Sequence, residues 1–478
     1  MRTKKTKRVM SVLCAGALSA SMLAGCGGNK ASEDEMVTLK WVLPSAAQDG
    51  LSEVLEEANK ITREKIGAEM DIVLIDDGAY QQKVNLMMTS GDQLDLVWTG
   101  YMNEYQKVAQ NGGLKDITEL VDQVGMNEVV PEYFLEAAKI DGRIYGIPNQ
   151  QVISNPYALT VFTDLLEKYN FDPSTVKHIE DMEPFFEKIK ANEPDMIALD
   201  PDLGAWTLDY KDVEIGTNVT YKKGLPDGKL YLVQETDEYK EGMKKLNEWY
   251  NKGYIRKDVL SAGDTSSQKL AGKYAVWNAT WAPGSEASAK AQYKRDVTFI
   301  KLEEPYVSRR SPLLTMTSVG ATTKNAEKAV ELIKLVNSDK ELFNILAYGI
   351  KDKDYTLDDE GKVIVNDNAS YEMPAWKLGN AFNAYLKSGQ SDDVVEQTVE
   401  MNNTAETSVL LGFVPKLTQL SSKVSQVQAI NDEYAALKKG AVNPDGYYEE
   451  YIKRLNEAGQ QEILQELQKQ VDEFMKTK

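Results

Sequence analysis

Short stretches of alternating and helical hydrophobic pattern follow one another along the first hundred residues. Residues 38–43 alternate between hydrophobic and polar side chains, as in a half-buried strand. Residues 51–66 carry hydrophobic side chains at helical spacing, and Gly67 stands where such a helix would end. Further elements of the same kinds are strands over 70–75 and 94–98 and a helix over 80–88. Strands that alternate with helices predict a parallel sheet with crossover helices.

The same alternation begins again near residue 157. The predicted strands are 157–162, 274–277, 297–300 and 313–320, and the predicted helices include 164–169, 179–190, 237–252 and 286–293. Residues 356–365 read as a hairpin, strand patterns stop past about 395, and one long helix is predicted to follow Asn443. About 450 residues are expected to divide into more than one lobe. We therefore predict an α/β protein with two lobes and a helical C-terminal region.

The predicted domain boundaries follow from these two passes. Residues 37–155 form lobe 1, to which about 311–365 return, and residues 156–310 form lobe 2. Residues 366–478 form a helical region that packs on the lobes. No internal repeat of 20–50 residues is present, which excludes solenoids and propellers.

The first 36 residues differ from the rest of the chain. Five basic residues precede an apolar run over 9–24, which is shorter than the roughly 20 residues that span a bilayer. This pattern predicts a secretory signal peptide over residues 1–25. The sequence Leu23-Ala24-Gly25-Cys26 resembles the lipobox of bacterial lipoproteins. That resemblance implies cleavage before Cys26, lipidation (palmitate) of its thiol, and a polar tether over 26–36; an ordinary signal peptide with an incidental cysteine is the alternative.

Charge and cysteine content exclude several classes of function. The chain has 55 basic and 74 acidic residues, a net charge of −19, and the leading segment carries five of the basic ones. An acidic chain is a poor partner for nucleic acid or for a face of anionic lipid. Cys14 and Cys26 lie at the leading end and His178 is the one histidine, so no disulfide, zinc site or other cofactor is expected in the folded part.

The order of several motifs resembles the extracellular solute-binding proteins of bacterial ABC importers, in particular the family-1, sugar-type group. The matching stretches are 94–99, which is similar to the family's third strand, 142–148, 272–281, 318–337 and 348–350. The region from about 340 resembles a domain of unknown function found on a lipoprotein subset of these receptors. The resemblance implies a periplasmic-binding-protein-like (venus-flytrap) fold in which a ligand binds between two lobes that close by a hinge.

The same resemblance implies what the protein does and where. We expect a surface-anchored monomer outside the cytoplasm, held to the membrane only by its lipid. It would capture a sugar or oligosaccharide and deliver it to the transmembrane subunits of an ABC permease, without being an enzyme. Two alternatives stay open: a receptor for peptides or other solutes, and an anchored glycoside hydrolase with two catalytic carboxylates, although the chain lacks the strand and helix count of a (β/α)₈ barrel.

Sugars present apolar C–H faces and a rim of hydroxyl groups, so a sugar site needs aromatic rings and fixed polar groups. Aromatic residues at predicted loop mouths are therefore candidates: Trp98, Tyr101, Trp206, Trp277, Trp281 and Trp376. The polar candidates are Ser45, Asp49, Thr99, Asn149, Gln150, Asp209 and Asn278. The Arg309-Arg310 pair could meet a carboxylated sugar or could be a solvated pair. Acidic residues over 352–354 and 358–360 lack the spacing of a calcium loop, so no metal is expected.

Overall fold

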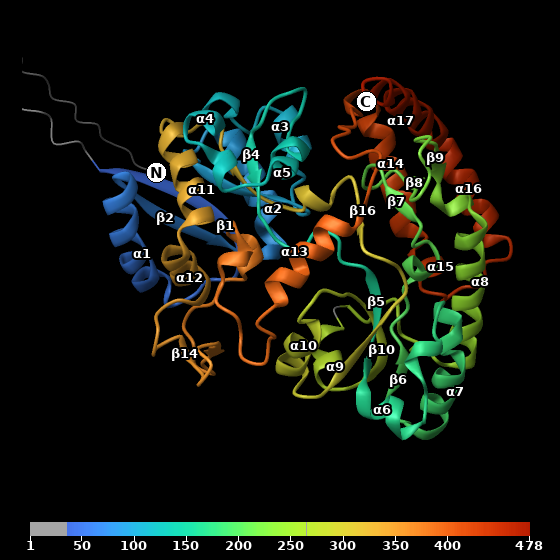
Figure 1. Cartoon of the computed structure of the whole chain (residues 1–478). Helices are drawn as coiled ribbons and strands as arrows, with labels where there is room; N and C mark the ends of the chain where they lie inside the picture. Colours follow the sequence, from blue (N-terminus) through green and yellow to red (C-terminus); the bar gives the residue numbers. More distant parts are fainter. Residues whose placement is uncertain (1–35, 264) are drawn as a thin grey trace, which may run out of the picture. The chain divides into compact units, whose positions relative to one another are not determined.

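A five-stranded sheet organises the first half of the chain (Figure 1), and its strands run in the order β2-β1-β3-β13-β4. The computed structural model describes residues 36–263 and 265–478; the predicted signal peptide, Cys26 and most of the predicted tether lie outside these residues. The strands are β1 (Val37–Pro44), β2 (Ala68–Ile75), β3 (Leu96–Gly100), β4 (Gly146–Pro148) and β13 (Thr315–Val319). The predicted parallel pairing is confirmed for β2-β1-β3 and is wrong for β13, which is antiparallel to both of its neighbours.

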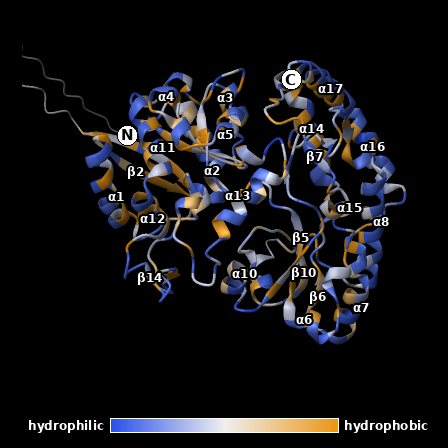
Figure 2. Cartoon of the chain, viewed as in Figure 1, coloured by the Kyte–Doolittle hydropathy of each residue, from blue (hydrophilic) through white to orange (hydrophobic). Residues whose placement is uncertain are grey.

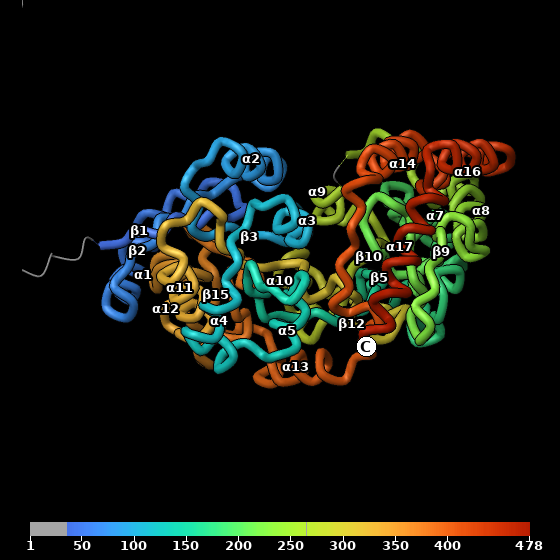
Figure 3. Tube along the Cα trace, turned by 90° about the horizontal axis from the view of Figure 1, so that it is seen from above, coloured from blue at the N-terminus to red at the C-terminus, as the bar shows by residue number. Residues whose placement is uncertain are grey.

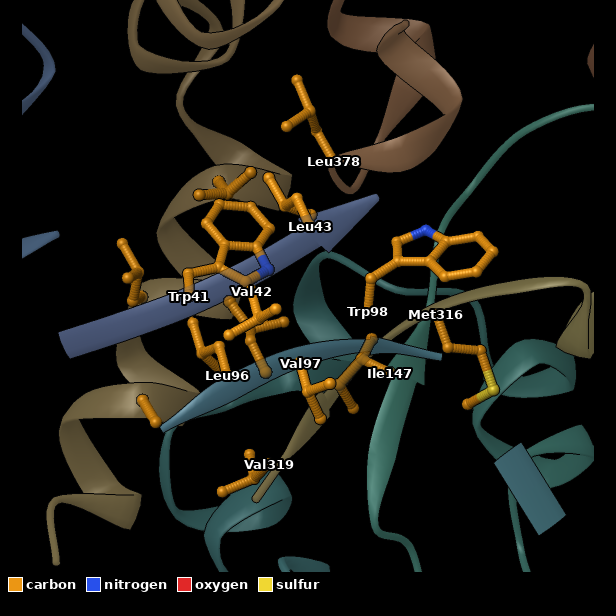
Figure 4. Close-up of a cluster of buried hydrophobic side chains, with 14 of the residues drawn as sticks. Trp41, Val42, Leu43, Leu96, Val97, Trp98, Ile147, Met316, Val319 and Leu378 are labelled. Carbon is orange, nitrogen blue, oxygen red and sulfur yellow. The ribbon is translucent and has the colours of Figure 1, made fainter. Parts of the chain in front are cut away.

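Helices cover this sheet and close a first hydrophobic core. They are α1 (Leu51–Ile66), α2 (Asp77–Ser90), α11 (Ala326–Ser338) and α12 (Lys340–Tyr348). α1 ends at Gly67, whose φ of 63° is left-handed and whose N–H donates to the carbonyl of Arg63, as the sequence predicts. Figure 4 shows Trp41 and Trp98 on the side of the sheet that faces Leu378, with Val319 on the opposite side. Segments that are far apart in the sequence, between Leu39 and Leu378, therefore build one core.

A second sheet, in the order β11-β5-β10-β6, lies within a second hydrophobic core. Its strands are β5 (Tyr157–Phe162), β6 (Ile197–Leu199), β10 (Tyr274–Thr280) and β11 (Val297–Lys301). β5 pairs antiparallel with β10 and β11, and only β6 is parallel to β10, so this sheet is mixed rather than parallel. The accompanying elements are α6 (Thr163–Lys168), α7 (Glu183–Asn192), α8 (Asp237–Lys252), α9 (Ser266–Leu270), α10 (Ser285–Tyr293), β7 (Tyr210–Asp212), β8 (Val219–Lys222) and β9 (Leu230–Leu232).

The C-terminal helices complete the second core. They are α14 (Ser421–Glu433), α15 (Ala435–Lys438), α16 (Tyr447–Glu457) and α17 (Gln460–Met475). The single long helix predicted after Asn443 is wrong, because Gly459 adopts a φ of 90° and divides it into α16 and α17. Leu455, Ile463 and Leu467 are buried in the second core, and Figure 2 shows both hydrophilic and hydrophobic residues along these helices. Figures 1 and 3 both place α17 beside β9, where Gln468 accepts a hydrogen bond from the Leu230 N–H.

Three segments pass between the two cores and are held together by hydrogen bonds, three of which involve the Asn402 side chain. Asn402, in α13 (Val394–Thr404), accepts hydrogen bonds from the Ile153 N–H and the Ser154 hydroxyl, both at 3.0 Å. Its amide donates to the Gln151 carbonyl at 2.8 Å. Two short strands, β12 (Tyr306–Val307) and β16 (Glu406–Thr407), pair next to this point. The segments near 151–154, 306–307 and 402–407 are therefore bound to one another where they cross.

The remaining elements are short. They are α3 (Tyr105–Gln110), α4 (Thr118–Gln123), α5 (Glu132–Ala137), β14 (Tyr355–Leu357) and β15 (Val363–Val365), of which the last two form the predicted hairpin. No helix within residues 36–263 and 265–478 has the length and apolar character needed to cross a bilayer. Tyr371, Met373 and Leu378 belong to the first core, against which Leu411 and Val414 also pack, and the buried hydrophobic residues from Val427 to Val471 belong to the second. The predicted domain boundaries themselves stay a prediction.

Gly440 tests how tightly the C-terminal region presses on α8. A Cβ at Gly440 would lie 2.4 Å from the backbone carbonyl oxygen of Leu246, whereas a Cβ at Gly446 would meet no atom within 4 Å; both glycines have positive φ. We expect Gly446→Ala to cost about 1 kcal/mol of unfolding free energy from backbone strain alone. Gly440→Ala should cost about 1–3 kcal/mol more, because α8 must shift. Urea unfolding of both variants measures the difference, and equal costs would contradict this packing.

Candidate functional site

The carboxyl ends of the parallel strands β1 and β3 point to one edge of the first sheet. Ser45 follows β1, Tyr101 follows β3, and α2 begins nearby at Asp77. In open α/β sheets, ligands bind in the crevice outside the carboxyl ends of the strands. A ligand site is therefore expected at this edge of the sheet, where three of the candidate aromatic residues meet.

Trp98, Tyr101 and Trp376 form a cluster that we call the aromatic platform. The Trp98 ring centroid lies 5.4 Å from that of Tyr101 and 6.4 Å from that of Trp376, both in edge-to-face geometry. Trp98 is fully buried, so it supports the other two rings rather than facing solvent. Tyr101 is 45% exposed and Trp376 is half-buried, which leaves two ring surfaces open to a ligand. The platform joins residues that lie 278 positions apart in the chain.

Polar contacts fix the position of Trp376. The buried ammonium group of Lys377 donates to the Pro44 carbonyl at 2.7 Å and lies 5.1 Å from the Trp376 ring centroid. The amide of Asn149 donates to the Trp376 carbonyl at 3.0 Å. Asp77 accepts from Lys377 at 3.4 Å. Burial raises the pKa of Tyr101 and the nearby charge of Asp77 adds to this, so its phenol stays neutral and can donate a hydrogen bond.

The other polar candidates of the first lobe play different parts. Thr99 is buried and shares a 2.6 Å hydrogen bond with Ser318, so its side chain is used inside the sheet. Asn149 is buried beneath Trp376 and positions it. Ser45 is half-buried and accepts from Gln48 at 3.2 Å. Asp49 is exposed and borders a shallow depression with residues 365–372. Of these four, Ser45 and Asp49 are open to solvent.

A second group of polar and aromatic residues lies at one end of the second sheet. The carboxylate of Glu303 accepts from the Tyr157 N–H, from Lys211 and from Lys223, all within 3.0 Å. Burial would raise the pKa of Glu303, but Lys211 and Lys223 outweigh it and hold that pKa below its usual value. The Tyr157 hydroxyl donates to Asp202 at 3.1 Å. These residues were missed in the sequence, because strand ends rich in Lys and Glu look like ordinary solvated surface.

Two candidate residues border this second group. Trp281 follows β10; its ring lies 4.1 Å from the Lys301 ammonium, and its indole N–H donates to Glu286 at 2.8 Å. Asp209 is exposed and lies 3.4 Å from the Lys223 ammonium. Trp281 keeps part of its surface open to solvent. The second sheet therefore offers one partly exposed ring surrounded by charged groups.

Trp206 and Trp277 pack within the second core instead. Trp277 is 3% exposed and its ring centroid lies 5.2 Å from that of Phe162. Trp206 is half-buried, lies 5.5 Å from the Trp249 ring centroid, and donates its indole N–H to the Glu180 carboxylate. Within the described residues, neither ring makes an aromatic contact or a side-chain hydrogen bond with the aromatic platform or the Glu303 group. Their role as ligand contacts stays a prediction.

A cavity of about 330 Å³ begins at Gly100, the residue before Tyr101. Its walls come from the loop after β3, from the segments around Glu214 and Arg309, and from residues 415–425 of the C-terminal region.

Arg309 is 1% exposed, so the solvated-pair interpretation of Arg309-Arg310 is wrong for the first of the two arginines. Burial and the neighbouring Glu104 raise the pKa of Glu214 to about 7. Within the described chain, no cluster of three or more His, Cys, Asp or Glu side chains is arranged to hold a metal ion, in this cavity or outside it.

Comparison with known proteins identifies the fold and its relatives. Residues 57–352 match the family described as bacterial extracellular solute-binding protein, and residues 409–476 match a domain of unknown function. A carbohydrate ABC transporter substrate-binding protein of Streptococcus pneumoniae is 28% identical and is aligned over 98% of this chain and 96% of its own length. The lipoprotein LipO of Bacillus subtilis is 22% identical over 72% of this chain and 73% of its own length.

Solved structures agree with these sequence matches. The N-glycan transport solute-binding protein NgtS of Streptococcus pneumoniae superposes with a TM-score of 0.83 at 25% identity, covering 92% of this chain and 99% of that one. The NgtS complex with Man5GlcNAc gives a TM-score of 0.76 at 26% identity over the same shares of both chains. The expected periplasmic-binding-protein-like fold and the resemblance to sugar-type solute-binding proteins are both confirmed.

The raised pKa of Glu214 predicts a pH-dependent stability. An unfolded glutamate ionises near pH 4.5, but Glu214 in the folded protein holds its proton up to about pH 7. The unfolding free energy contributed by this group therefore falls as pH rises from about 4.5 to 7. Between pH 5 and pH 8 the unmodified protein should lose about 1–3 kcal/mol of unfolding free energy that the Glu214→Gln variant does not lose. Urea unfolding at both pH values measures this loss, and Glu400→Gln, at an exposed position, is the control. If the unfolding free energies of the two variants change equally between pH 5 and pH 8, the raised pKa of Glu214 is contradicted.

Proposed function

The chain belongs to the bacterial extracellular solute-binding protein family, and on that premise we propose that it captures an oligosaccharide and delivers it to an ABC importer. The relatives with carbohydrate or N-glycan in their names support the choice of ligand class. The observation that carries the proposal is the aromatic platform at the carboxyl ends of β1 and β3. Its chemistry matches the surface of a sugar ring.

The platform offers what a pyranose face requires. A sugar ring presents axial C–H bonds on one face, and these pack favourably against an aromatic surface. Tyr101 and Trp376 supply two such surfaces, 6.4 Å apart between ring centroids and inclined at 45°. The neutral Tyr101 hydroxyl and the carboxylate of Asp77 can bond the hydroxyl groups at the rim of the sugar. Because Lys377 and Asn149 fix Trp376 before a ligand arrives, little side-chain freedom is lost on binding.

The second sheet supplies polar partners of opposite kinds. Around Glu303 there are two ammonium groups, two carboxylates and the Tyr157 hydroxyl, and Trp281 adds one partly exposed ring. Such groups can donate to and accept from sugar hydroxyls at fixed positions. A ligand that lacks a matching hydroxyl leaves one of these groups unpaired, and this is how polar sites discriminate. We infer that the Glu303 group selects ligands by hydrogen bonds to their hydroxyl groups, while the platform packs against the face of a sugar ring.

Delivery requires a membrane partner and a fixed location. We propose that the ligand is passed unaltered to the transmembrane subunits of an ABC permease, and that the protein works as a monomer outside the cytoplasm. Its relatives are solute-binding proteins rather than enzymes. We further propose that lipidated Cys26 holds it to the membrane, since the sequence there resembles a lipobox and one relative is named a lipoprotein. A tether increases the effective concentration of a receptor near its permease.

Binding of Man5GlcNAc to the purified protein tests the proposal and the platform together. We expect this glycan to raise the thermal unfolding midpoint, because it binds the folded state alone. Tyr101→Ala and Trp376→Ala should each weaken binding by about tenfold, which corresponds to about 1.4 kcal/mol of lost ring contact. The affinity is measured by calorimetry. Tyr133→Ala is the matched control, since Tyr133 is 38% exposed and lies in α5, outside the platform.

Three results would count against the proposal. Unchanged affinity in both platform variants would show that the glycan binds elsewhere. Stabilisation by a peptide library with none by any oligosaccharide would favour the peptide receptor. Shortening of the glycan in the calorimeter cell, detected by mass spectrometry, would favour a glycoside hydrolase.

Trp281 tests the contribution of the second sheet. We expect Trp281→Ala to lower the affinity for Man5GlcNAc about three- to tenfold with little loss of stability, because part of the ring is already solvated. The unfolding midpoint without ligand separates the two effects. Tyr447→Ala, on the exposed face of α16, is the control. An affinity equal to that of the unmodified protein would remove Trp281 from the site.

A further inference from the structure

We propose that the cavity beginning at Gly100 is a subsite for a carboxylate-bearing sugar unit, held by the guanidinium groups of Arg309 and Arg310. This inference rests on the proposed function and extends it from neutral glycans to acidic ones. Nothing in the names of the relatives assigns this cavity a ligand. Unpaired hydrogen-bond donors, the local charge and the position of the cavity support this assignment.

The cavity has the size and the surroundings of a ligand subsite. A volume of about 330 Å³ lies at the small end of the range for ligand pockets. Gly100 ends β3 and Glu104 belongs to the loop that follows it with Tyr101, so a glycan on the platform can extend into the cavity. Pro415, Thr418 and Ser421 form the opposite wall. They lie in the region that matches a domain of unknown function, which thereby gains a part in ligand selection.

Arg309 is buried with one donor left unpaired. Its Nη1 donates to the Gln106 side-chain oxygen at 2.9 Å and to the Phe413 carbonyl at 3.1 Å, and its Nη2 donates to the Val213 carbonyl. All three acceptors are uncharged. Within the described chain its Nε has no hydrogen-bond partner, although the whole side chain is 1% exposed. A buried cation with an unpaired donor is costly, and an anionic ligand group would offset that cost.

Arg310 presents a free guanidinium to the same cavity. It is half-buried, and its side chain makes no hydrogen bond or ion pair with any described residue; its charge acts on Glu214 and Asp212. The planar guanidinium fork fits a carboxylate through two parallel hydrogen bonds. Lys107 also lines the cavity. Three basic side chains therefore meet here in a chain whose net charge is −19.

The carboxyl groups of the cavity do not cancel this positive charge. Glu214 lies 3.7 Å from the Arg309 guanidinium and close to Glu104. Because Glu214 is largely enclosed, and because the nearby Glu104 carboxylate opposes a second negative charge, the pKa of Glu214 is raised to about 7. Near neutral pH Glu214 is partly protonated and can donate to a ligand oxygen. The cavity thus keeps a net positive charge. A neutral sugar hydroxyl would accept hydrogen bonds from the basic side chains but would not balance this charge.

Matched acid and ester ligands test the assignment directly. The probes are 3′-sialyllactose and digalacturonate, each compared by calorimetry with its own methyl ester, which keeps the shape and removes the charge. We expect at least one acid to bind at least tenfold more tightly than its ester at pH 6 and low salt. Arg310→Gln should reduce that ratio to about one, while the affinity for Man5GlcNAc stays unchanged. Lys324→Gln, an exposed lysine outside the cavity, should leave the ratio intact.

Two results would overturn the assignment. One is that neither acid is preferred to its ester, whether or not either compound binds. The other is that the preference survives in Arg310→Gln, which would place the anion elsewhere. Binding of Man5GlcNAc separates the two levels of inference: if it binds and the acids are not preferred, only the acidic subsite fails. If it does not bind either, the proposed function fails with it.

Discussion

The arrangement of the molecule depends on the hydrogen bonds of Asn402 where three segments cross between the two cores. One buried amide accepts from Ile153 and Ser154 and donates to Gln151, so each of its polar atoms is used. Those segments belong to parts of the chain about 250 residues apart. Because a buried amide that loses its partners is costly, the crossing point has one strongly preferred register. Each sheet edge, and with it each half of the candidate site, is placed relative to this crossing.

The aromatic platform illustrates how a candidate site is assembled from distant residues. Trp98 and Tyr101 come from the strand β3 and its loop, while Trp376 arrives from a segment that has already passed through both cores. The contacts that bring Trp376 into place are polar and reach back to Pro44 and Asn149. A purely apolar contact would leave the ring free to slide. Directional hydrogen bonds fix the inclination of the ring surfaces that a sugar would meet.

The sequence predicts local structure better than it predicts the site. Helix α8 has the bounds that its hydrophobic spacing indicates, and Gly67 ends α1 as expected, because both features depend on neighbouring residues. The division between α16 and α17 was missed, since a glycine within a helical pattern does not reveal its φ. The burial of individual side chains is harder to predict from the sequence than the bounds of the helices. Trp98 and Trp277 lie near strand ends as the partly exposed Trp281 does, yet both are buried, and the burial of Arg309 depends on Val213 and Phe413, which are far away in the sequence.

A single short segment connects the parts on which binding would depend. Asn149 holds Trp376, the next residues reach Asn402, and Tyr157 belongs to the Glu303 group at the end of the second sheet. Nine consecutive residues therefore touch the platform, the crossing point and the opposite half of the site. Since Asn149 is bound to the first core and Tyr157 to the second, any relative movement of the cores must be absorbed between them. A ligand that contacts both Trp376 and the Glu303 group would hold together the two ends of this short segment. Binding of the ligand would therefore restrict movement at the crossing point near Asn402.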